Sequence, residues 1–402
     1  MPYRLLPPDV LRVGQPTLFA LRDKTGCLLV PKGTLVASAE QLAQLAAREL
    51  YVDEQDGEML LRAIAGKVDE LVRGNELLGR IARARPDAAD LAPAAAGRRR
   101  LDDAAADWSN LQERLAALLR DPAQPGFAAR VVQLQKSVLD HLDSDADDAL
   151  LVLVHGATQE FHDYSARHAL LVAVVCELAS RQLAGFTPAE RLSLRCAALT
   201  MNLAMTALQN QLALQEDPPS AAQRAEIGSH AERGAAALCA AGVVDLLWLD
   251  AVRRHHDAPP GPLGTLPAAL RLARLILRAD VFAARLSPRR GRPALSATAA
   301  AKAAYLDENN QPDEAGSAII KAIGMYPPGS LVRLASGEAA VVLRRGRRAN
   351  APAVASVVNA AGSMLGTPAP RDTLLPAHAV RSGVAPHEMK VRLNLQQLLQ
   401  MS

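Results

Sequence analysis

The sequence has few cysteines, little net charge and no long uninterrupted apolar segment. Its four cysteines are far apart in 402 residues and no pair has the spacing of zinc ligands, which argues against a disulfide framework and a zinc finger. The formal net charge is only +3, so no chain-wide field indicates a nucleic-acid partner. No segment approaches 18 uncharged apolar residues, and the first residues are unlike a signal peptide. We therefore expect a cytoplasmic protein with no membrane span and no nucleic-acid partner.

The N-terminal part of the chain predicts a small α/β module followed by a linker. Half of all residues are hydrophobic, so a chain of this length can bury a core and form more than one domain. Short alternating runs in residues 9–53 lead into a helical pattern that begins at Ser38. We place this module at residues 1–75. Residues 76–107, rich in alanine, proline and charge, predict the linker.

The rest of the chain predicts a helical domain with a small β extension. Residues 108–330 are helical in pattern, and capping boxes mark helix starts at Thr187 and Ser220. The period changes to two after Ser330, so residues 331–402 predict a hairpin and a further strand. The expected fold is mainly α, with the small α/β module before the helical bundle and a short β appendage after it.

The helical domain contains five side chains of the type that bind divalent metals. They are His168, His230, His255, His256 and Asp280. Neutral imidazoles and a carboxylate are ligands for transition metals, and helical bundles commonly bring such ligands together. Each residue alone also has a structural interpretation, because a helical histidine is usually a satisfied core group and Asp280 can pair with Arg274 or Arg278. Both interpretations stay open on these residues alone.

Several separated stretches resemble HD-GYP domains, a helical branch of the HD hydrolases that opens cyclic di-GMP at a centre of two or three metals. In the order of that family they read "YSARHALLVAVVCELA", "CAALTMNLAM", "SHAERGAAAL", "WLDAVRRHHD", "LILRADVFAARLSPRRGR" and "IGMYPPGSLVRLASGEAAVV". The resemblance spans roughly residues 150–345 and rests on several motifs rather than one. It implies an HD-type helical bundle.

The resemblance also assigns roles to individual residues. It matches the five candidate ligands to metal-ligand positions of the family, whereas Met201, Asn202 and Met205 stand where the family has its His-Asp pair and catalytic lysine. The acidic ligand of three-metal members would fall at Tyr164. After the histidine pair, "APPGPLG" at residues 258–264 replaces the Gly-Tyr-Pro loop.

These replacements lead us to expect a degenerate metal site. The aspartate of the parent pair bridges two metals, whereas Asn202 offers only a neutral carbonyl, which is a weak ligand. The bridged two-metal site is therefore not expected. His230, His255 and His256 can still hold one divalent metal, iron, manganese or zinc, because three imidazoles and a water form a known open site.

The resemblance places Arg289 and Arg292 where the family grips the phosphates of the cyclic dinucleotide, and guanidinium groups suit such oxygens. The alternative is an exposed basic turn. We expect a catalytically degenerate HD-GYP-like signalling domain that binds a protein partner or cyclic di-GMP rather than hydrolysing it, and a homodimer is compatible with this role. The alternatives are an active metal-dependent cyclic di-GMP phosphodiesterase with a reduced metal site, and a structural scaffold.

Overall fold

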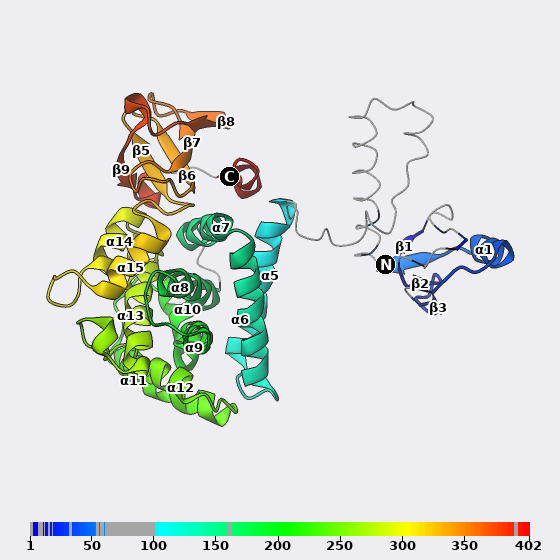
Figure 1. Cartoon of the computed structure of the whole chain (residues 1–402), viewed down its shortest axis with the longest axis horizontal. Coiled ribbons are helices and arrows are strands. Elements are labelled where there is room, and N and C mark those ends of the chain that lie inside the picture. The colour runs from blue at the N-terminus through cyan, green and yellow to red at the C-terminus, as the bar shows by residue number, and fades with distance from the viewer. Residues whose placement is uncertain are drawn as a thin grey trace. The chain divides into compact units, whose positions relative to one another are not determined.

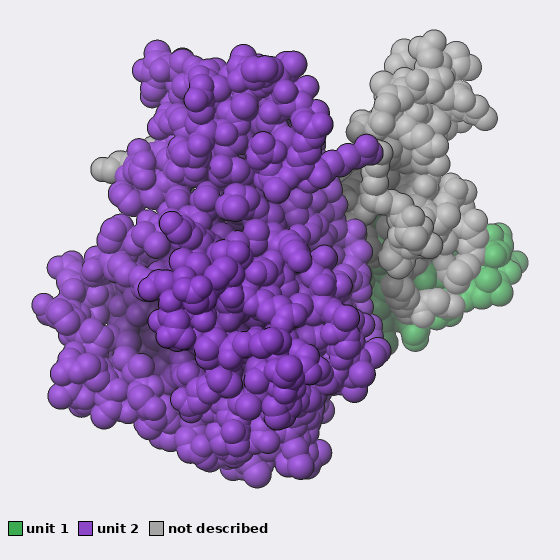
Figure 2. Space-filling model, turned by 60° about the vertical axis from the view of Figure 1, so that its left-hand side comes forward, with its two compact units in different colours: residues 1–99 green, residues 100–402 purple. Residues whose placement is uncertain are grey.

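The structure is a computed structural model with two compact units, residues 1–99 and 100–402, coloured green and purple in Figure 2. It describes residues 3–6, 11, 13–14, 17, 19–31, 34–53, 56, 60, 101–159, 163–389 and 393–402. Most of the predicted linker, residues 76–100, lies outside the described residues. Residues 101–107 are helical, so the helical domain begins before Trp108. This stretch is rich in alanine, which favours a helix, but it has few large apolar residues to signal one.

The first unit contains a small antiparallel sheet and a helix, as predicted. Its elements are β1 (Tyr3–Leu5), β2 (Leu21–Arg22), β3 (Leu28–Val30), α1 (Ala39–Ala46) and β4 (Tyr51–Asp53), with strand order β1-β4-β2-β3. Helix α1 begins at the predicted residue, because the Ser38 side chain accepts a hydrogen bond from the Gln41 amide. Buried Phe19, Leu50 and Val52 belong to the small core of this unit.

The second unit is a helical bundle, which confirms the predicted mainly α fold (Figure 1). Its described helices are α5 (Leu101–Arg120), α6 (Phe127–Ser144), α7 (Ala146–Gln159), α8 (Tyr164–Ser180), α9 (Pro188–Thr200), α10 (Thr206–Leu214), α11 (Ala221–Ala240), α12 (Leu246–Arg254), α13 (Ala268–Leu286), α14 (Ala297–Tyr305), α15 (Glu314–Ile323) and α16 (Leu395–Leu399). Short 3-10 turns are η2 (Leu203–Met205), η3 (Leu263–Thr265), η4 (Pro376–His378) and η5 (Pro386–Glu388). None of the described helices combines the length and apolar character needed to cross a bilayer.

Helix α8 is the central element of the bundle. Every residue of this helix is buried, and it packs against α7, α9, α13 and α15 (Figure 1). A helix that is apolar on all sides is stable only where other elements surround it. The predicted capping boxes at Thr187 and Ser220 both form and start α9 and α11. Of the helices that carry the candidate ligands, α13 packs directly against α8, while α12 packs against α13 and α11 against α12.

The C-terminal β extension is larger than the predicted hairpin and further strand. Its strands are β5 (Leu331–Leu334), β6 (Ala339–Arg344), β7 (Ala353–Val358), β8 (Met364–Arg371) and β9 (Val380–Val384), all antiparallel in the order β8-β7-β6-β5-β9. Strands β5, β6 and β7 agree with the prediction, but β8 and β9 were not predicted. Strand β8 contains two prolines and a glycine and strand β9 a glycine, which weaken the sequence signal for a strand.

The sheet is attached to the bundle by ion pairs and packing. Strand β6 packs against α7, and β9 packs against α14. Arg344 of β6 forms an ion pair with Asp145, which precedes α7, at 2.6 Å between Nη2 and Oδ2. The adjacent Arg345 pairs with Asp147 at 2.5 Å. The sheet and the bundle therefore form a single packed unit.

Candidate functional site

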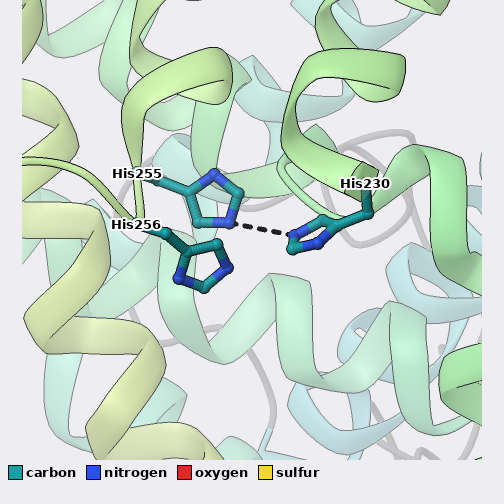
Figure 3. Close-up of side chains that lie close together, drawn as sticks. All are labelled: His230, His255 and His256. Atoms are coloured by element: carbon teal, nitrogen blue, oxygen red, sulfur yellow. Dashed lines mark hydrogen bonds between the residues drawn. The ribbon is translucent and has the colours of Figure 1, made fainter. Parts of the chain in front are cut away.

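Three of the predicted ligands come together at the surface of the bundle. His230 lies on α11, while His255 and His256 directly follow the last residue of α12 (Figure 3). One ring nitrogen from each of the three lies within 4.8 Å of the others. His230 and His255 are buried and His256 is exposed, so the cluster reaches solvent through His256. The packing of α11 against α12 brings these residues together.

Backbone carbonyls determine which nitrogen of the two buried rings carries a proton. Nδ1 of His230 lies 2.5 Å from the carbonyl oxygen of Ile227, and Nδ1 of His255 lies 2.7 Å from that of Val252. Because a carbonyl oxygen only accepts, each Nδ1 carries the proton, and a neutral ring then has a lone pair on Nε2. Burial lowers the pKa of both histidines, to about 3 for His255, so both rings are neutral at pH 7.

The two free lone pairs suit a metal ion. Nε2 of His230 and Nε2 of His255 face each other at 3.2 Å, drawn as the dashed contact in Figure 3. Two nitrogens that each lie about 2.1 Å from one ion are separated by roughly 3 Å at ordinary coordination angles. The ring of His256 lies with its centroid 5.0 Å from that of His230 and 4.0 Å from that of His255. This donor set fits one divalent transition metal, and the two carbonyls orient its ligands.

The other two predicted ligands pair with each other. Nε2 of His168, on α8, lies 2.7 Å from Oδ1 of Asp280, on α13. The His168 side chain is 1% exposed and that of Asp280 is 21% exposed. Burial alone would raise the pKa of Asp280, but the hydrogen bond and charge of His168 lower it to about 2. The alternative pairing of Asp280 with Arg274 or Arg278 is wrong, because these arginines bind Asp313 and Glu308 instead.

Residues 201–203, part of the segment that the resemblance aligned with a His-Asp pair, are buried. Met201 follows α9 and is completely buried, and Asn202 is 7% exposed. The 3-10 turn η2 packs against α11, where Gly234 lies one turn after His230. The backbone carbonyl of Asn202 accepts a hydrogen bond from the Met205 amide at 2.9 Å. This segment offers a buried thioether and an uncharged amide, and so it supplies no carboxylate.

The two predicted phosphate-binding arginines lie in an ordered turn after α13. The amide and carbonyl groups of Arg289 and Arg292 bond to each other at 2.9 and 2.8 Å. Gly291 allows this turn to approach the carbonyl oxygen of Glu216, from which a Cβ atom would lie only 2.6 Å away. Arg289 and Arg292 are half-buried, whereas Arg290 between them is exposed. The exposed residues of this turn are Arg290 and Gly291, and Nη2 of Arg292 donates to the carbonyl oxygen of Ala284.

Tyr164 lies between Arg289 and the His168–Asp280 pair. Its ring stacks on His168, with centroids 5.7 Å apart, and the Arg289 guanidinium lies 5.5 Å from its centroid. Burial and the charge of Arg289 lower the pKa of Arg292. The Tyr164 hydroxyl and Nε of both arginines are buried without a hydrogen-bond partner among the described residues. Sequence reasoning treated Tyr164 only as a lost acidic ligand, although its spacing of four residues from His168 places both on one helix face.

No protein-family model matches the chain. The chain is 27% identical over 219 residues to cyclic di-GMP phosphodiesterase PA4108 of Pseudomonas aeruginosa, a match that covers 54% of this chain and 51% of that protein. The chain thus spans about half the length of this relative. The solved structure of Bd1817, an HDG"Y"P protein from Bdellovibrio bacteriovorus, aligns with a TM-score of 0.44 and 15% identity over 79% of this chain and 98% of that one.

Proposed function

We infer that this chain is an HD-GYP domain protein, because its sequence is similar to that of a cyclic di-GMP phosphodiesterase. We propose that it acts as a regulatory module that binds cyclic di-GMP rather than hydrolysing it. The division of the five predicted ligands carries this proposal. Three imidazoles converge on one point, while His168 and Asp280 are engaged with each other at 2.7 Å. The three imidazoles of one half of a two-metal site are therefore available to bind an ion, whereas the two residues of the other half are hydrogen-bonded to each other.

The three histidines are the residues that would hold a single metal. When bound, such an ion would act as a Lewis acid toward a phosphate oxygen. The protein itself contributes two neutral buried rings, His230 and His255, whose orientation is set by the carbonyls of Ile227 and Val252. His256 contributes the solvent-exposed side of the cluster.

The absence of hydrolysis is supported by the residues around the second half of the site. A carboxylate that bridges two metals neutralises part of their charge, and the amide of Asn202 cannot do so. Met205 replaces the family's lysine and removes a cation that would stabilise developing negative charge. Groups that act together in catalysis lose their effect together, so the loss of any one of them already removes most of the rate enhancement.

Binding of the dinucleotide is supported by the turn that carries Arg289 and Arg292. The Arg289 guanidinium lies beside Tyr164, and Nε of each arginine and the Tyr164 hydroxyl are buried without a partner among the described residues, while Nη2 of Arg292 donates to the carbonyl oxygen of Ala284. Guanidinium groups bind phosphate oxygens with two parallel hydrogen bonds, and unpartnered buried donors commonly mark a place where a ligand contacts the protein.

Calorimetry with cyclic di-GMP tests the proposal. We expect micromolar binding to the full chain that is lost when Arg289 and Arg292 are both replaced by alanine. Arg290→Ala is the matched control, because this exposed arginine belongs to the same turn but forms only a distant ion pair with Glu216, at 3.8 Å. No detectable heat of binding up to about 1 mM cyclic di-GMP, where the binding free energy is only about 4 kcal/mol, would contradict the proposal and favour the protein-partner alternative.

A second candidate, an active phosphodiesterase that works with one metal, is favoured by the convergent imidazoles and by the activity in the relative's name. Its test is a turnover assay with cyclic di-GMP in manganese and in iron. Hydrolysis that disappears in His255→Ala would establish this second candidate and overturn the first. A rate at background level, equal in the wild type and in His255→Ala, is the result we expect.

A further inference from the structure

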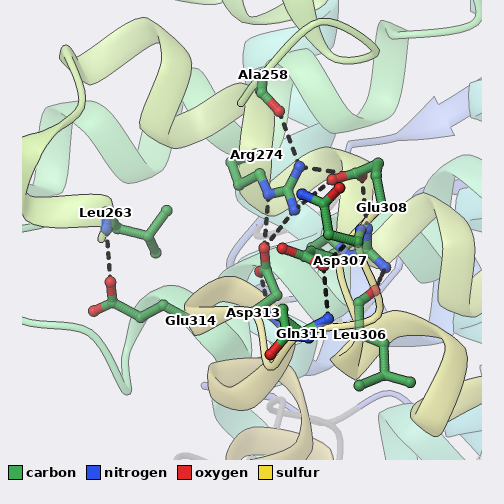
Figure 4. Close-up of polar contacts among 12 residues, drawn as sticks. Ala258, Leu263, Arg274, Leu306, Asp307, Glu308, Gln311, Asp313 and Glu314 are labelled. Atoms are coloured by element: carbon green, nitrogen blue, oxygen red, sulfur yellow. Dashed lines mark hydrogen bonds and ion pairs between the residues drawn. The ribbon is translucent and has the colours of Figure 1, made fainter. Parts of the chain in front are cut away.

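The segment that follows the histidine pair, here called the proline loop (residues 258–264), is anchored at both ends. Ala258 and Leu263 are buried, whereas residues 259–262, with the sequence Pro-Pro-Gly-Pro, are exposed between them. The carbonyl oxygen of Ala258 accepts a hydrogen bond from Nη1 of Arg274 at 2.9 Å. The amide of Leu263 donates to Oε2 of Glu314 at 2.6 Å (Figure 4). Helices α13 and α15 thus hold an exposed loop through one contact at each end.

Arg274 is itself held in one orientation. Its side chain is 1% exposed, and Nε and Nη2 donate to Oδ2 of Asp313 at 2.8 and 2.5 Å. Nη1 and Nη2 also donate to Glu308, at 3.2 and 3.0 Å (Figure 4). Asp313 is fixed in turn, because its other oxygen accepts from the Gly316 amide at the start of α15. A planar guanidinium with every donor engaged is a rigid support for the carbonyl of Ala258.

His256 is the member of the histidine cluster that depends on this support. Nδ1 of His230 contacts a carbonyl of its own helix, α11, and Nδ1 of His255 contacts a carbonyl of the helix that it directly follows, α12. For His256, no ring hydrogen bond is found in the described part of the chain, and the residue lies after the last helical residue of α12. Its position therefore depends on the main chain around it, which is held by the hydrogen bond from the Asp257 amide to the carbonyl oxygen of Arg254 and, one residue further on, by Arg274 at Ala258.

We propose that Arg274, assisted by Glu314, is a positioning residue that holds the proline loop so that His256 faces the Nε2 atoms of His230 and His255. This inference rests on the proposed metal site. Arg274 touches no ligand of that site directly. Its effect passes through the carbonyl of Ala258, as outer groups commonly do when they orient metal ligands.

The test compares three variants of the full chain. Arg274→Lys keeps the charge beside Asp313 but cannot reach Ala258 with the same fork of donors. Glu314→Ala removes the anchor of Leu263 at an exposed position, where substitutions usually change stability by little. Glu308→Ala is the matched control, since Glu308 does not contact the loop and Asp313 still accepts from Nε and Nη2 of Arg274 when Glu308 is removed.

Cobalt(II) affinity and its visible spectrum are the first readout, because the spectrum reports the number and geometry of ligands. We expect Arg274→Lys to weaken cobalt binding by about 10- to 100-fold with an altered spectrum, and Glu314→Ala to weaken it less. Glu308→Ala should keep the wild-type affinity and spectrum even where it lowers the melting temperature. Amide hydrogen exchange of residues 258–264 in metal-free protein is the second readout, and it should accelerate in the first two variants only.

The outcomes separate the two proposals. If the wild type binds no cobalt, both the proposed metal site and the positioning role of Arg274 are wrong. If the wild type binds cobalt and Arg274→Lys binds it with unchanged affinity and spectrum, the metal site stands and the positioning role is wrong. Equal losses in all three variants would also overturn the positioning role, since they would indicate a general loss of stability.

Discussion

His230 and His255 turn their unprotonated Nε2 atoms toward each other across 3.2 Å, and each ring is held by a carbonyl of the helix that carries it or directly precedes it. Two lone pairs at this distance repel unless a cation or a proton lies between them. We therefore expect purified protein to retain one zinc or manganese ion per chain after dialysis, measured by mass spectrometry of the metal. His255→Ala should lose it, and His141→Ala, a histidine on α6 outside the cluster, should not. Two tightly held ions per chain would contradict the single site.

The hydrogen bond between His168 and Asp280 should contribute to the stability of the metal-free protein. Asp280→Asn removes a charged acceptor from a buried imidazole, and we expect it to lower the free energy of unfolding by about 2 kcal/mol. Chemical denaturation in the presence of a chelator measures this. Asp257→Asn is the control, since Asp257 is exposed beside the histidine pair, and its change should stay within about 0.5 kcal/mol. Equal effects of the two substitutions would show that the pair is not a distinct interaction.

Two glycines on helices should respond in opposite ways to substitution by alanine. At Gly316 a Cβ atom would overlap the carbonyl oxygen of Ala304 and lie 2.7 Å from Cα of Tyr305, so Gly316→Ala should destabilise the fold by about 3 kcal/mol. At Gly228 nothing lies within 4 Å, so Gly228→Ala should stabilise it by about 0.5–1 kcal/mol through helix propensity. Thermal or chemical unfolding of both variants checks the sign. A stabilising Gly316→Ala would show that α14 and α15 are not in close contact there.

Two of the four thiols should react with reagents in the folded protein, and the other two should be protected. Cys27 and Cys239 are exposed, and Cys176 and Cys196 are buried. Burial raises the pKa of Cys196 to about 12 and raises that of Cys176 well above its usual value, so neither forms a thiolate at pH 8. A thiol-reactive dye should therefore modify two thiols in the folded protein and four in denaturant.

The same pKa values set the sign of a pH effect on stability. A thiol whose pKa is higher in the folded state binds its proton there while the unfolded chain releases it. The unfolding free energy is therefore unaffected below about pH 8.5 and falls as the pH rises through about 12. Replacement of Cys196 by alanine should weaken this decline. If the unfolding free energy declines equally in this variant, other titrating groups cause the pH dependence.

The sequence by itself determined the features that depend on neighbouring residues. The capping boxes at Thr187 and Ser220 form between groups three residues apart, so their presence can be read from the chain. The hairpin turn at Ser336 and Gly337 is equally local, and Gly337 has the positive φ that such a turn requires. Motifs that resemble those of HD-GYP domains indicated the candidate ligands, including the adjacent pair His255 and His256. The same resemblance predicted, without coordinates, that Met201 and Asn202 stand where that family has its His-Asp pair.

Only the tertiary structure decided how these residues combine. His168 meets Asp280 across 112 positions of the chain, and Arg274 meets Asp313 across 39, so no local pattern encodes either pair. The partner of a charged side chain depends on which helices pack together, because hydrogen bonds act over only about 3 Å. For this reason the five predicted ligands could be named from the sequence, whereas their division into a convergent cluster and a closed pair followed from the packing of α8, α11, α12 and α13.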